Sequence, residues 1–157
     1  MLEDRILLSA VLGGQIFSTG GNVQVEVISR SSAFTYDLYT FKPGESTSGF
    51  VADVFIVNSA SIGSVVDIGS FWAGQELVLG IITPEANEFL IGPGSRNLDG
   101  IPHATVDFIV SGVANIRFED LFGGGDNDFN DAVFQVRGAI TSFFVGTPDI
   151  TLLLGDT

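Results

Sequence analysis

The 157-residue sequence contains no cysteine and a single lysine, Lys42. The absence of cysteine excludes disulfides, thiolate zinc sites and cysteine nucleophiles, and it leaves the redox compartment open. Lysine and arginine together number 6 against 19 acidic residues, which gives a net charge of −13. Nucleic acid and anionic membrane surfaces both require a basic footprint, so neither is an expected partner. A cation is the natural counterpart of this charge.

Long apolar runs are also missing, and none approaches the length needed to cross a bilayer. We therefore expect no membrane insertion. Charged residues make up only 16% of the chain and hydrophobic residues 45%, while glycine occurs 20 times. This composition fits neither a disordered tail nor a charged helical protein. It is typical of an all-β chain with many turns.

Apolar and polar residues alternate in short runs separated by Gly, Pro, Asn or Ser, which is the period of half-buried strands. The length suits one domain over residues 1–157, with residues 1–14 as an N-terminal extension or pairing segment. About ten strands at this spacing predict an antiparallel β-sandwich or jelly roll. The runs cover residues 23–27, 34–38, 51–57, 65–68, 76–82, 88–91, 103–110, 113–118, 132–136, 140–145 and 150–154.

The segment 118–134 is acidic and contains three consecutive glycines. Asp126, Asp128 and Asn130 lie at i, i+2 and i+4, the spacing of the opening ligands of an EF-hand loop, and Asp131 adds another oxygen nearby. So many carboxylates would repel one another without a cation. The pattern predicts a calcium loop between two strands. An acidic turn without metal is the alternative, because Asp, Asn and Gly are ordinary turn residues.

The loop also departs from an EF-hand. Its sixth position is Asp131 instead of glycine, and its twelfth is Arg137 instead of the glutamate that closes such a site. A helix-loop-helix is therefore not expected. We expect the missing acidic ligand to come from Glu119 or Asp120, brought back by a reversal at the three glycines.

The same segment resembles a known family, the bacterial domain-of-unknown-function family numbered 4114. The resemblance is carried by residues 117–121, 123–126 and 128–134, and upstream by residues 74–77, 89–91 and 97–104, so it covers residues 74–137. It implies a calcium-binding β-sandwich of secreted and surface proteins, including adhesins, with peptide or glycan ligands. It implies an extracellular or cell-surface location and no enzymatic activity.

Three further residues are candidates for ligand binding. Asn97 and Asp99 lie in the longest loop, residues 92–100, which precedes the acidic loop by one hairpin and is expected at the same end of a sandwich. Their alternative role is turn formation before Gly100. Trp72 lies at a turn where its indole could stack on a sugar or peptide, although core packing is favoured.

His103 is the only histidine, and no G-x-S-x-G nucleophile elbow is present. We expect His103 to be a strand-end histidine that bonds a nearby carbonyl or carboxylate, and we expect no catalysis.

Two functional classes follow. The first is an extracellular calcium-binding module that captures a glycan or peptide. The second is a structural subunit of a filament, matrix or surface layer, whose apolar terminal segments, residues 5–12 and 149–154, pair with sheet edges of other copies.

Overall fold

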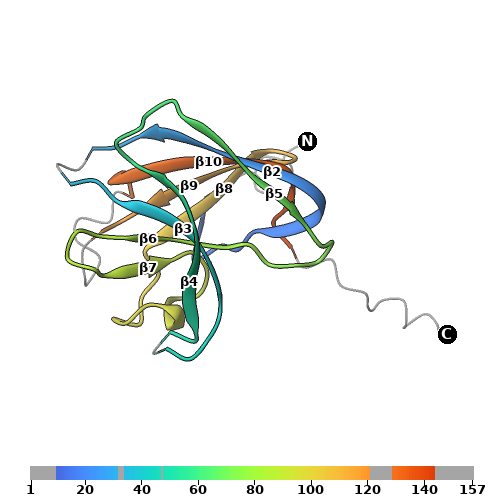
Figure 1. Cartoon of the computed structure of the whole chain (residues 1–157). Coiled ribbons are helices and arrows are strands. Elements are labelled where there is room, and N and C mark those ends of the chain that lie inside the picture. Colours follow the sequence, from blue (N-terminus) through green and yellow to red (C-terminus); the bar gives the residue numbers. More distant parts are fainter. Residues whose placement is uncertain (1–9, 32–33, 47, 121–128, 144–157) are drawn as a thin grey trace.

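The computed structural model describes residues 10–31, 34–46, 48–120 and 129–143, and over these ranges the protein is an all-β sandwich (Figure 1). The predicted fold class is therefore confirmed. The strands are β1 (Val11–Leu12), β2 (Phe17–Ser29), β3 (Asp37–Pro43), β4 (Phe50–Asn58), β5 (Val65–Phe71), β6 (Val78–Ile82), β7 (Glu88–Leu90), β8 (Ala104–Val110), β9 (Val113–Phe118) and β10 (Ala132–Thr141). Within the described ranges, the one helical element is a short 3₁₀ turn, η1 (Gly94–Arg96).

The strands form two antiparallel sheets. The larger has the order β1-β8-β9-β10-β2-β5, and the smaller has the order β4-β3-β6-β7. Hairpin β8–β9 is extended by β10, so the chain leaves β9 and re-enters the same sheet through the acidic loop (Figure 1). Ala132 pairs with Phe118 at this end. The acidic loop therefore connects two neighbouring strands of one sheet.

Alternation of side chains creates the core between the sheets. Val23, Val25 and Val27 of β2 are fully buried, whereas Gln24 is exposed. Strands β8, β9 and β10 also contribute rows of buried residues, whereas β5 contributes partly buried ones. The smaller sheet packs fully buried residues such as Leu79 against them. Full burial of one such aliphatic side chain stabilises the fold by about 1.5–3 kcal/mol. The valine pattern that predicted β2 thus also fixes which face of the strand is buried.

Some predicted elements are wrong. Residues 140 and 141 do not begin a separate strand, because β10 continues to Thr141. The break in the pattern is a bulge: the register with β2 shifts after Gly138, whose φ of 129° is accessible to glycine. Phe34 does not start the strand that contains Leu38, since β3 begins at Asp37 and Phe34 is exposed. The predicted strand at residues 150–154 lies outside the described residues.

Residues 11 and 12 of the predicted pairing segment form β1, which pairs with β8 of the same chain at the edge of the larger sheet. In the part of the chain that the structure describes, no helix is long and apolar enough to cross a membrane.

Candidate metal centre

Three carboxylates converge where β9 ends and β10 begins. Glu119 and Asp120 follow β9, and Asp131 precedes β10. The Asp131 N–H donates to the carbonyl of Phe118 at 3.1 Å, which extends the β9–β10 pairing by one step beyond Ala132. Strand pairing thus brings together residues that lie more than ten positions apart in the sequence.

One ligand oxygen from each of Glu119, Asp120 and Asp131 lies within 4.8 Å of the other two. Glu119 is 1% exposed, and the other two residues are partly exposed. The sequence predicted that Glu119 or Asp120 would be brought back to the acidic loop, and the structure brings both of them to Asp131. Burial of a carboxylate beside two others is costly unless a positive charge or hydrogen bonds compensate it.

Each carboxylate accepts a hydrogen bond that orients it. The Phe129 N–H donates to Oε1 of Glu119 at 3.3 Å, and the Asp120 N–H donates to Oδ2 of Asp131 at 3.0 Å. Oδ2 of Asp120 accepts the hydroxyl of Tyr36, a fully buried residue that precedes β3. The cluster is therefore held from both sheets.

Tyr36 could not be found from the sequence. It lies in the apolar phase of a run and predicts core packing alone. Only the packing of the two sheets places its hydroxyl against the acidic cluster.

The remaining predicted metal ligands divide into two groups. Asn130 is described, and its carbonyl and its side-chain Oδ1 each lie 2.9 Å from the hydroxyl of Ser31, just beyond β2. Asp126 and Asp128 lie outside the described residues. Phe129, which follows Asp128 and precedes β10, has a φ of 54°, an uncommon conformation for a residue with a side chain. The chain thus turns sharply just before it reaches Asp131.

The donor set fits a hard cation. All three groups offer carboxylate oxygen, and in this cluster no nitrogen or sulfur ligand competes. Calcium binds oxygens at about 2.3–2.6 Å, so two ligands on opposite sides of the ion lie roughly 4.6–5.2 Å apart. The three oxygens lie within 4.8 Å of one another, so they are close enough to share one calcium coordination sphere. Calcium takes about 6–8 oxygens, so backbone carbonyls, water or further loop residues would complete the sphere.

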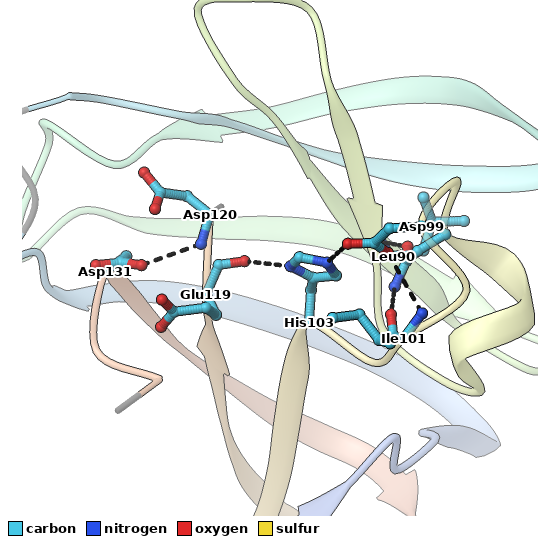
Figure 2. Close-up of polar contacts among 8 residues, drawn as sticks. Leu90, Asp99, Ile101, His103, Glu119, Asp120 and Asp131 are labelled. Carbon is cyan, nitrogen blue, oxygen red and sulfur yellow. Dashed lines mark hydrogen bonds and ion pairs between the residues drawn. The ribbon is translucent and has the colours of Figure 1, made fainter. Parts of the chain in front are cut away.

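The second loop lies against the same end of the sandwich (Figure 2). Asn97 is 5% exposed: its Oδ1 accepts from the Leu90 N–H at 2.8 Å, and its amide donates to the Ile101 carbonyl at 2.9 Å. Asp99 is bound to His103, with 2.6 Å between Oδ2 and Nε2. Both side chains therefore hold the loop to the sandwich. Their role in ligand binding stays a prediction.

His103 confirms the expectation of a histidine that bonds a carbonyl or a carboxylate, since it contacts one of each. Its Nδ1 lies 2.8 Å from the carbonyl of Glu119 and its Nε2 faces Asp99. A carbonyl only accepts, so Nδ1 carries the hydrogen. The link between the two loops through His103 was not predicted, because sequence spacing does not show which carbonyl or carboxylate a histidine faces.

Core packing of Trp72, the interpretation favoured from the sequence, is wrong: this residue is 82% exposed. It begins a turn in which the Gln75 N–H donates to the Trp72 carbonyl. The strand before it pairs with Gly21 near the start of β2, whereas Ser29 at the other end of β2 pairs with Val133 beside the acidic cluster. Trp72 therefore lies at the end of the larger sheet opposite the candidate metal centre, and its role in ligand binding stays a prediction.

Residues 74–139 match the model of a protein family described as Domain of unknown function (DUF4114). The predicted resemblance to this family is thereby confirmed for residues 74–139. The range includes the whole acidic cluster together with Asp99 and His103. Neither the curated proteins nor the solved structures give a match.

Proposed function

We propose that the protein is a calcium-binding β-sandwich module that works outside the cell or at the cell surface and captures a glycan or peptide ligand. The observation that carries the calcium proposal is the convergence of Glu119, Asp120 and Asp131 within 4.8 Å. The sequence between Asp120 and Asp131 contains Asp126 and Asp128, which we propose as further calcium ligands. The net charge of −13 makes a divalent cation a favourable counterion.

The location and the ligand class rest on the family resemblance. Calcium at the centre would give this acidic end a positive charge, to which a carboxylate or hydroxyl of a ligand can bind. No catalytic role is proposed, because His103, the one histidine, is buried between two loops.

Calcium binding is tested by isothermal titration calorimetry and by thermal melting of the full chain. Calcium is added after treatment with chelator, with magnesium at the same concentration and sodium chloride at the same ionic strength as controls. We expect a calcium-specific rise in melting temperature that Asp126→Ala and Asp128→Ala both reduce. A wild-type melting temperature that responds equally to calcium and to sodium chloride would remove the metal proposal.

Ligand capture is tested on glycan and peptide arrays with calcium and with chelator. We expect binding that the chelator abolishes, and Trp72→Ala identifies whether the exposed indole takes part. An array without calcium-dependent binding would count against the ligand-binding role, but it would not affect the proposal that the protein binds calcium.

The second candidate function is a self-assembling structural subunit. It is favoured by β1, in which Val11 and Leu12 are 54% and 55% exposed at the edge of the larger sheet. Exposed apolar edge strands are templates for pairing with another chain. Light scattering at high protein concentration with calcium decides between the two functions, since a compact monomer excludes assembly.

A further inference from the structure

A buried histidine clamps the backbone of Glu119 from two sides. The Glu119 N–H donates to the carbonyl of His103 at 2.8 Å, and the Glu119 carbonyl accepts from Nδ1 of the same histidine at 2.8 Å. His103 is fully buried and directly precedes β8. The residue that supplies the buried carboxylate of the candidate metal centre is therefore fixed through both of its peptide groups by one partner.

The imidazole ring is itself held in place. It stacks on Phe89, with 3.9 Å between ring centroids and 22° between planes. Its far nitrogen contacts Oδ2 of Asp99 at 2.6 Å, and Oδ1 of Asp99 accepts from the Ile101 N–H at 3.3 Å. A ring with both nitrogens bonded and one face stacked has little rotational freedom. Its orientation thus depends on where Asp99 lies.

Asp99 belongs to the loop of residues 92–100, so a continuous chain of contacts runs from this loop through His103 to Glu119 (Figure 2). The same loop supplies Ser95 and Leu98 to the wall of a pocket of about 390 Å³. Metal centres commonly depend on such supporting contacts, because they set the orientation of the groups that bind the ion.

We propose that His103 and Asp99 are positioning residues of the cation centre. They hold the backbone of Glu119 so that the carboxylates of Glu119 and Asp120 stand opposite Asp131 before the ion arrives. Because coupling between two sites is reciprocal, the bound cation in turn restrains the loop of residues 92–100 and the pocket wall that it forms. This inference rests on the proposed calcium binding.

The experiment combines hydrogen exchange by mass spectrometry with calcium titration by calorimetry, both on the full chain. In the wild type we expect calcium to slow amide exchange in residues 94–100 by about 5-fold or more, the lower end of ordinary coupling between sites. Asp99→Ala breaks the contact with His103. It is expected to abolish this calcium-dependent slowing and to weaken calcium binding by a similar factor of about 5.

Two variants serve as controls. Asp99→Asn keeps a side chain that can bond Nε2, because an amide offers both a donor and an acceptor, so it is expected to retain the calcium response and the affinity. Glu88→Gln removes an exposed charge from the rim of the same pocket without touching His103, and it is expected to behave as the wild type. Exchange of the β2 amides shows that each variant is folded.

The outcomes separate the two proposals. If the wild type binds calcium but exchange in residues 94–100 does not change, or if Asp99→Ala binds calcium as tightly as Asp99→Asn, the positioning role is overturned and the calcium proposal stands. If the wild type binds no calcium, the proposed function itself is overturned and the positioning role with it. Loss of the response in Asp99→Ala with its retention in Asp99→Asn supports the proposal.

Discussion

Substitution of Asp131 by asparagine is expected to change stability in opposite directions with and without calcium. Asn keeps an oxygen that can accept the hydrogen bond of the Asp120 N–H, so the local geometry is largely preserved. What changes is the charge of one carboxylate that lies within 4.8 Å of two others. Without calcium this removes repulsion, and with calcium it removes a charged ligand.

The two effects have comparable size. Two unit charges no more than 4.8 Å apart repel by at least about 0.9 kcal/mol at the dielectric constant of water and by at least about 3.5 kcal/mol at an effective value of 20. Asp131 is partly exposed, so the lower repulsion energy applies to each of its two acidic neighbours. The neutral side chain of the Asp131→Asn variant accepts a weaker hydrogen bond from the Asp120 N–H than the carboxylate does, which offsets part of the stability gained by removing this repulsion. We therefore expect Asp131→Asn without calcium to be more stable than the wild type by about 1 kcal/mol.

With calcium the order reverses. Extracellular calcium modules have dissociation constants on the order of 10⁻⁴ to 10⁻³ M, so about 10 mM calcium stabilises the wild type by about 1.4–2.7 kcal/mol. For a domain of this size that corresponds to a rise of roughly 3–11 °C in melting temperature. The variant is expected to lose most of this rise, because it binds the ion with one charge fewer.

Differential scanning calorimetry of both proteins, with chelator and with calcium, measures all four states. Asp53→Asn is the matched control: it makes the same change on β4 of the other sheet, where the charge pairs with exposed Lys42. A variant that is less stable than the wild type in chelator, or that keeps the full calcium-dependent rise, would refute the reasoning.

Three further predictions concern other parts of the fold. Gly138→Ala is expected to cost about 3 kcal/mol or more in chemical denaturation, since a Cβ there would lie 2.2 Å from the carbonyl oxygen of Asn22; Gly100→Ala also has a positive φ but open space, and should cost only about 1–2 kcal/mol. Trp72→Ala is expected to change the free energy of unfolding by no more than about 0.5 kcal/mol, because the indole is exposed. The N–H of Gly69 and the side-chain amide of Asn22 lower the pKa of Asp67 below 3.8. This carboxylate therefore stabilises the fold above that pH, and its contribution is lost as the pH falls through the lowered pKa. An NMR titration of Asp67 should show the low midpoint, and Asn22→Ala should raise that midpoint.

Much of the fold could be predicted because each half-buried strand shows in the sequence as an alternation of apolar and polar residues. The alternation through Val23, Val25 and Val27 identifies both the strand and its buried face. The prediction failed where a local signal has two meanings. The break around Gly138 suggested a turn, but the strand absorbs it as a bulge, because the neighbouring strands hold the backbone in register on both sides. The prediction that Trp72 packs in the core was wrong for a related reason, since an aromatic side chain beside a turn is compatible with burial and with exposure.

The sequence by itself determined the composition of the candidate centre. The spacing of Asp126, Asp128 and Asn130 and the acidic pair at 119 and 120 are properties of the chain, and they are sufficient to predict oxygen ligation. Only the tertiary structure decided which groups meet. Pairing of β9 with β10 brings Asp131 to the acidic pair, and sheet packing adds the hydroxyl of Tyr36. These contacts join residues far apart in the sequence, so they depend on the register and packing of whole sheets, which a local pattern of residue types does not specify.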